Sequence, residues 1–270
     1  MRRILGCFKV IPDLELLSEE DWIADDNNLV DTSFVKSTWN VFDESALELM
    51  LRLSEQSESL NEPFSMDAVT IGDKISEKYL KTLHALGIDQ AVRIECRESI
   101  QFSPEIVSGL LTEYIRQKGK QDIIVMGTKT ADGSSGKVPQ LTAEKLGYPC
   151  VTQVIAIEPM EQNNIKITNI TDTGLCIQTI CPPCVLAVGE APGTCLSVPT
   201  LKARMNTKAK PVEVYTAGQL LKGNLSDIQK ETVLTELTAV DEKRCGKVIC
   251  DGSLEEQIEI LYQSYLKGKV

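Results

Sequence analysis

Apolar and helical patterns alternate along the first 157 residues of the chain. Short apolar runs that predict buried strands lie at residues 3–8, 67–71, 91–95, 122–126 and 151–157. Apolar side chains at helical spacing lie between these runs, at residues 40–53, 75–86, 104–115 and 138–146. Repeated alternation of strand and helix is typical of an α/β protein with a mostly parallel, doubly wound sheet that has helices on both faces.

Capping residues set the expected ends of the helices. Asn40 suits the N-cap of the first helix, and Asp43 follows three residues later, close to a capping box. Gly87 suits the stop of the second helix, and Pro104 opens the third.

The pattern changes after residue 157. Residues 165–169 and 175–179 alternate at period two, which predicts an antiparallel excursion before a buried strand at residues 185–188. We expect the α/β domain to span residues 1–212 and residues 213–270 to form a C-terminal arm. That arm ends in an amphipathic helix at residues 254–266, whose apolar stripe a second subunit could cover.

The segment at residues 123–137 carries the most information about function. An apolar strand runs into Gly127, a loop of small polar residues follows, and a helix begins at Val138. Backbone N–H groups of such a loop can approach an anion, and the positive end of the next helix points at the same place. A turn that binds nothing is the alternative. Lys137 could touch a phosphate or lie on the surface, and Asp132 could hold a ribose or cap a turn.

Composition and charge exclude several classes of function. The net charge of −11 argues against nucleic acid, which needs a basic surface. No stretch approaches the roughly 18 apolar residues of a membrane span, so we expect no membrane insertion. The N-terminal apolar run is too short for a secretion signal, which favours a cytoplasmic protein.

The cysteines allow a metal site as a less favoured interpretation. Cys176, Cys181 and Cys184 are spaced like the first three cysteines of a plant-type ferredoxin, with Cys195 beyond them. Two prolines stiffen the Cys181–Cys184 turn, and an apolar strand follows it, so packing is the favoured role. The single histidine, His84, lies in a helical pattern, and we expect it to be structural.

Residues 191–212 form a basic segment in an acidic chain. The segment contains four cations and no carboxylate. It is either a solvated loop or a surface that docks onto an acidic partner.

Several segments together resemble the β subunit of electron transfer flavoproteins, over about residues 1–215. Cys7 to Asp13 looks like that family's first strand and Lys-x-x-x-Asp turn, and Trp39 to Ala46 looks like its Asn-Pro-Phe-Asp/Cys-Glu-x-Ala helix entry. The other similar segments are Val69-Thr70-Ile71-Gly72, the loop at residues 127–139, Thr173-Gly174-Leu175, and Val198-Pro199-Thr200-Leu201-Lys202-Ala203-Arg204, which is similar to the family's partner-recognition loop.

The resemblance implies a fold of the adenine nucleotide α-hydrolase-like type and an electron carrier subunit rather than an enzyme. It implies a heterodimer with an α subunit that carries FAD, and AMP or a second FAD in this chain. The C-terminal arm would contact the α subunit, and a flavin dehydrogenase would dock at Val198, Pro199, Leu201, Lys202 and Arg204. The implied nucleotide contacts are Cys7, Lys9, Asn40, Ile71, Gly72, Gly127, Asp132, Gly133, Ser134, Ser135, Gly136, Lys137 and Val138.

The chain departs from the family pattern at several positions, which suggests a divergent bacterial member. The family's Pro after Asn40 is Val41, its loop Gln is Lys137, its Glu after Gly-Gly-Leu is Cys176, and its anchor Leu is Val198. A cation in place of an amide favours a phosphate ligand. One rival interpretation is an adenine-nucleotide sensor of the universal-stress type, and the other is a cysteine-ligated metal or Fe–S protein.

Overall fold

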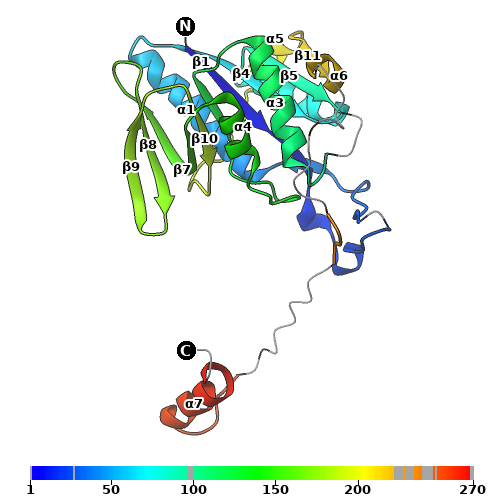
Figure 1. The fold of residues 1–270 in the computed structure, drawn as a ribbon, viewed down its shortest axis with the longest axis vertical. Coiled ribbons are helices and arrows are strands. Elements are labelled where there is room, and N and C mark those ends of the chain that lie inside the picture. Colours follow the sequence, from blue (N-terminus) through cyan, green and yellow to red (C-terminus); the bar gives the residue numbers. More distant parts are fainter. Residues whose placement is uncertain are drawn as a thin grey trace. The chain divides into compact units, whose positions relative to one another are not determined.

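The computed structural model describes residues 2–26, 28–96, 100–221, 228, 234–238, 246 and 248–267 (Figure 1). The chain divides into two compact units, Met1–Glu236 and Leu237–Val270. The expected arm at residues 213–270 therefore lies partly outside the described residues.

A nine-stranded sheet forms the centre of the first unit, in the order β11-β5-β4-β1-β6-β10-β7-β8-β9. All neighbouring strands from β11 to β7 pair in parallel, whereas β8 and β9 pair antiparallel at one edge. This confirms the predicted mostly parallel sheet with an antiparallel excursion. The strands are β1 (Arg2–Phe8), β4 (Phe64–Ile71), β5 (Gln90–Glu95), β6 (Ile123–Gly127), β7 (Cys150–Pro159), β8 (Ile165–Thr171), β9 (Gly174–Ile180), β10 (Cys184–Val188) and β11 (Val212–Thr216).

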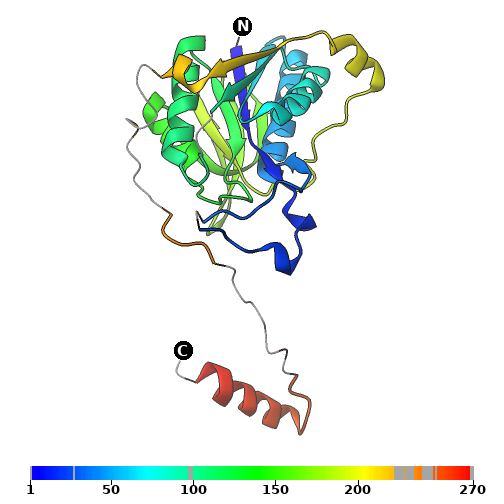
Figure 2. The same ribbon diagram turned by 90° about the vertical axis from the view of Figure 1, so that its right-hand side faces the viewer.

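Helices cover both faces of the sheet, as Figure 2 shows with the sheet between two helical layers. Successive residues of β1 point to opposite faces of the sheet. Ile4 packs in the core beneath α1 (Val41–Ser59) and α2 (Glu77–Ala85), whereas Leu5 packs in the core beneath the helices on the opposite face. The opposite helices are α3 (Pro104–Lys118), α4 (Val138–Leu146) and α6 (Ala217–Leu220). The doubly wound architecture is thus confirmed, since period-two alternation in the strands provides two apolar faces.

Chain order reverses between β1 and β6. The chain moves outward from β1 through β4 to β5. It then returns through the crossover helix α3, which places β6 on the other side of β1. In an open α/β sheet, the carboxyl ends of the strands on either side of such a switch point bound a crevice.

Two elements form where the sequence predicted only a loop or an arm. A short helix, α5 (Leu201–Thr207), forms within the basic segment, and β11 pairs in parallel with β5. The expected boundary at residue 212 falls on the first residue of β11. Both elements are short, and Glu213 is the second of the five residues of β11, so neither has a long apolar pattern.

Smaller elements lie in the acidic stretch after β1. Two short strands, β2 (Val10–Pro12) and β3 (Ser37–Trp39), form a separate antiparallel pair that brackets this stretch. Between them lie the 3-10 turns η1 (Leu14–Leu16) and η2 (Glu19–Asp21), and a further turn, η3 (Lys74–Ser76), precedes α2.

The second unit contains α7 (Leu254–Leu261), which continues as a π-helical turn, η5 (Tyr262–Leu266). Ser253 and Glu256 form a capping box at its start. The expected stripe, Ile258, Leu261, Tyr262 and Tyr265, is exposed. In the part of the chain that the structure describes, none of the helices is both long and apolar enough to span a bilayer.

Candidate functional site

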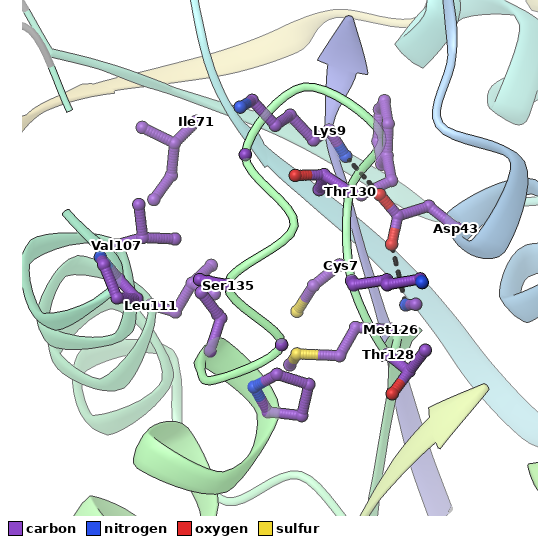
Figure 3. Close-up of a pocket in the computed structure, with 18 of the residues that line it drawn as sticks. Cys7, Lys9, Asp43, Ile71, Val107, Leu111, Met126, Thr128, Thr130 and Ser135 are labelled. Carbon is purple, nitrogen blue, oxygen red and sulfur yellow. Dashed lines mark hydrogen bonds between the residues drawn. The ribbon is translucent and has the colours of Figure 1, made fainter. Parts of the chain in front are cut away.

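A pocket opens at the carboxyl ends of β1, β4 and β6, beside the switch point. Its floor is apolar: in Figure 3, Ile71, Val107 and Leu111 lie on one side, and Met126 lies near Cys7. The loop that follows β6 borders the other side with small and polar residues. An apolar floor beside a polar loop suits a ligand that has a flat ring at one end and an anion at the other.

Asp43, in the first turn of α1, joins the two strands at the switch point. Its Oδ1 accepts a hydrogen bond from the Gly127 N–H at 2.7 Å, and its Oδ2 accepts one from the Lys9 N–H at 2.9 Å, as dashed in Figure 3. The side chain of Asn40 donates a third bond to Oδ2, also at 2.9 Å. Burial raises the pKa of Asp43 to about 6, although the three donors favour its ionised form.

Asn40 lies at the N-cap position of α1, as predicted, but its side chain makes no capping bond. The expected capping role of that side chain is therefore wrong. Its Nδ2 also donates to the carbonyl of Lys129 at 2.9 Å, and its Oδ1 accepts from the Ala131 N–H at 3.2 Å. Asn40 is fully buried, and its side chain satisfies backbone groups of the loop instead of the helix end.

Close packing at the end of β6 requires Gly127. A Cβ atom there would lie 2.6 Å from Asp43 Oδ1 and 2.7 Å from the Cβ of Phe42. The first turn of α1 thus packs directly on the backbone of β6, which places Asp43 within reach of the Gly127 N–H.

The loop at residues 128–137 presents backbone donors. Among the residues that the structure describes, no acceptor is bonded to the N–H groups of Gly133, Ser135 and Gly136. Ser134 and Gly136 have φ angles of 47° and 62°, so the loop turns sharply through the left-handed region. The N-terminus of α4 follows at Val138, and free N–H groups beside a helix N-terminus form an anion site.

The pocket contains only part of the predicted nucleotide-contact set. Asn40, Gly72, Asp132, Ser134 and Lys137 do not line it, and Lys137 is exposed at the start of α4. The members that line it are Cys7, Lys9, Ile71, Gly127, Gly133, Ser135, Gly136 and Val138.

Lys9 is already paired at the mouth of the pocket. Its Nζ lies 2.5 Å from Asp132 Oδ2, and the other carboxylate oxygen of Asp132 is buried without a hydrogen-bond partner in the described structure. This ion pair holds the loop over the carboxyl end of β1, and the carboxylate of Asp132 neutralises the charge of Lys9.

The pocket also contains residues that sequence reasoning missed. They include Asp43 and several apolar side chains from β4, α3 and the segment that precedes α3: Val69, Ile100, Phe102, Val107 and Leu111. The apolar residues carried only a core-packing pattern. Asp43 had a detectable feature, a carboxylate in the first turn of a helix that follows a strand end, but that feature indicated a cap.

The three cysteines considered as metal ligands differ in burial and in the element that carries them. Cys184 is buried in β10, Cys181 is exposed, and Cys176 is half-buried on β9. No set of three or more His, Cys, Asp or Glu side chains in the described ranges is grouped closely enough to hold a metal ion. His84 is buried and its two ring nitrogens contact the carbonyls of Ile88 and Pro211 at 3.0 and 3.1 Å.

A second surface is the predicted docking segment, residues 197–204. Val198 is 84% exposed and Leu201 is 74% exposed, with Lys202 and Arg204 also exposed, whereas Pro199 is buried. The segment is anchored from α1: Glu48, itself buried, accepts bonds from the N–H and the Oγ–H of Ser197 at 2.9 and 3.0 Å.

Comparisons with known proteins agree on one family. A family model described as "Electron transfer flavoprotein domain" matches residues 29–220. The chain is 29% identical to the Escherichia coli protein named "Putative electron transfer flavoprotein subunit YgcR", over 99% of this chain and 98% of the relative. It is 26% identical to "Electron transfer flavoprotein subunit beta" of Bacillus subtilis, over 86% of this chain and 87% of the relative.

Proposed function

The chain belongs to the electron transfer flavoprotein family, and from that premise we propose that it is a β-type electron carrier subunit. It holds an adenine nucleotide in the pocket at the ends of β1, β4 and β6. It forms a heterodimer with an α-type subunit that carries FAD, and it exchanges electrons with a flavin dehydrogenase.

The chemistry of the pocket carries this proposal. The apolar floor of Ile71, Val107 and Leu111 fits an adenine ring, and the unbonded N–H groups of Gly133, Ser135 and Gly136 fit a phosphate. AMP and FAD share both features, so either nucleotide suits the donor set. The residues present therefore fit the group that the family implies.

The chain binds and orients rather than performing acid–base chemistry. The flavin supplies the redox chemistry when it is bound. Asp43 and Asn40 fix the loop, the Lys9–Asp132 pair closes its mouth, and the apolar floor excludes water from the ring. No catalytic acid or base is assigned.

Two further surfaces complete the proposed carrier. The docking segment presents apolar side chains with a basic rim to an acidic dehydrogenase surface. The proposed arm, residues 213–270, contacts the α-type subunit through the residues beyond α6, because β11 and α6 pack in the first unit, and the exposed stripe of α7 supports this assignment. Free thiols in the described part of the chain support the proposed cytoplasmic location; they are Cys7, Cys150, Cys176, Cys181, Cys184, Cys195 and Cys250.

Co-expression with candidate α-type subunits tests the proposal. We expect a heterodimer with flavin absorption bands that bleach on reduction, and no flavin bands from this chain purified with the α-type subunit omitted unless the pocket itself holds FAD. A homodimer that releases ATP and binds no α-type subunit would support a nucleotide sensor instead. A brown preparation that loses its colour on Cys181→Ser would support a metal protein.

A further inference from the structure

Three hydrogen-bond donors converge on the carboxylate of Asp43, which is 4% exposed. They are the N–H of Lys9 at the end of β1, the N–H of Gly127 at the end of β6, and the side-chain amide of Asn40. The same amide of Asn40 binds the carbonyl of Lys129. Asp43 thus connects both strands of the switch point to the loop that carries the anion site.

We propose that Asp43 is a positioning residue whose ionised carboxylate holds the loop after β6 in its nucleotide-binding arrangement, and that the site loosens when this carboxylate takes up a proton. The inference rests on the proposed nucleotide function, because it concerns the same pocket. Asp43 does not need to touch the nucleotide to act in this way.

Counting donors and acceptors shows why the proton matters. An ionised carboxylate offers about four lone-pair positions, whereas a carboxylic acid uses one oxygen as a donor. Protonation leaves at most three acceptor positions for the three donors that face Asp43, and it turns charge-assisted hydrogen bonds into weaker neutral ones. Loss of the bond to Asn40 would release the carbonyl of Lys129 and the N–H of Ala131, which the Asn40 side chain now holds.

The other ionisable groups around Asp43 come from β1 and the loop. Cys7 lies beside it on β1, and burial followed by the charge of Asp43 raises the pKa of the Cys7 thiol. Lys9 lies close enough for its charge to lower the pKa of Asp43, and Asp132 pairs with Lys9. Lys129 lies over the ring of Phe42, at 5.5 Å from its centre. Because burial outweighs these partners, Asp43 titrates near pH 6.

Protonation has opposite consequences for the fold and for the site. The pKa of Asp43 in the folded chain, about 6, is above the ordinary aspartate value of 3.8. The folded state therefore binds the proton more tightly than the unfolded state, and acid stabilises the fold as far as this group is concerned. A role in positioning predicts weaker nucleotide binding over the same range of pH, which a purely structural role does not.

The test compares the wild-type chain with Asp43→Asn between pH 5 and pH 8, using AMP and FAD as probes in calorimetric titrations. Asparagine keeps the shape but offers a donor where a second acceptor is needed. We expect at least ~10-fold weaker binding for the variant at pH 8, because a charged hydrogen-bond network is broken. The ratio of the two dissociation constants should fall toward one at pH 5, and the titration of the phosphate of AMP cancels in this ratio.

Glu55→Gln is the matched control, since it removes one exposed carboxylate from the same helix. Its ratio to wild type should stay near one at every pH. A ratio for Asp43→Asn that stays within two-fold of one at pH 8, or one that does not change with pH, would overturn the inference while leaving the nucleotide site itself intact.

A measurement on the ligand-free chain separates failure of this inference from failure of the proposed function. Hydrogen exchange should show lower protection of the Gly127 and Ala131 amides at pH 5 than at pH 8 in the wild type, after correction for intrinsic rates. Asp43→Asn should show no such change. If neither AMP nor FAD binds at any pH, the proposed function fails, and unchanged protection in the wild type would overturn the role of Asp43 independently.

Discussion

The proposed nucleotide pocket and the proposed docking segment are both anchored by α1, but the pocket exposes backbone N–H groups whereas the segment exposes side chains. At the pocket, a buried carboxylate in the first turn of α1 holds the backbone of Lys9 and Gly127, and the loop beyond presents N–H groups. Further along the helix, Glu48 holds the backbone of Ser197, and the residues beyond present apolar side chains. The same device, a buried carboxylate that accepts backbone N–H groups, thus serves a site made of backbone and a site made of side chains.

This difference predicts which substitutions affect stability and which affect only binding. Substitutions in the pocket change buried packing, so they should affect both stability and nucleotide affinity. Substitutions of the exposed docking side chains should affect recognition alone. Substitutions of Glu48, which anchors the docking segment, should affect both stability and recognition, because Glu48 is buried.

The largest effect is expected for Gly127→Ala. The added Cβ would lie 2.8 Å from the backbone nitrogen of Asp43, which cannot move without displacing α1. We expect a loss of about 3 kcal/mol or more in the free energy of unfolding, measured by urea denaturation, and loss of nucleotide binding. Gly218→Ala is the control, because nothing lies within 4 Å of that Cβ. Equal stability of the two variants would contradict the packing described for β6.

The next effect is the pH dependence that Asp43 contributes to stability. Its folded pKa is raised to about 6, so its contribution is fully present below about pH 3.8 and is lost as the pH rises through about 6. Relative to Asp43→Asn, the free energy of unfolding of the wild type should fall by roughly 2 to 3 kcal/mol between pH 4 and pH 7. Urea denaturation at each pH measures this difference, and a rise over that range would contradict the sign of the shift.

Glu48→Ala should have a somewhat smaller effect. The change leaves the Ser197 N–H without its acceptor and removes the carboxylate that pairs with Arg52. We expect a loss of about 2 kcal/mol and faster proteolysis near residues 191–198. Glu48→Gln keeps an acceptor and should lose less. Unchanged proteolysis in both variants would show that the docking segment is held by other contacts.

Val198→Asp should have the smallest effect on stability. Because the side chain is largely exposed, the free energy of unfolding should change by no more than about 0.5 kcal/mol. Electron exchange with the dehydrogenase partner should nevertheless fall steeply, since a charge replaces the apolar group at the contact. If that partner reduced the flavin at the wild-type rate in the Val198→Asp variant, Val198 would not be part of the docking surface.

The strands near the switch point could be predicted from sequence because they are buried on both faces. Such strands are continuous apolar runs, and β6 matches its prediction to within one residue at each end. β11 and α5 could not be predicted in the same way. A five-residue edge strand that contains a glutamate and a helix of seven exposed or half-exposed residues have little apolar pattern.

The backbone part of the site was also predictable, whereas the side-chain network was not. Glycines and small polar residues after a strand mark a loop that a ligand can approach. The role of Asp43 depends instead on atoms 34 and 84 residues away in the sequence. Only the folded sheet brings these atoms together, so a local pattern indicated a helix cap.

The most direct test of the account is the identity and amount of the small molecules released when the purified heterodimer is denatured, measured by mass spectrometry. The account predicts one adenine nucleotide for each copy of this chain, as AMP or as FAD beyond the flavin of the α-type subunit. A heterodimer that releases only the flavin of its α-type subunit, with no nucleotide assignable to this chain, would contradict it.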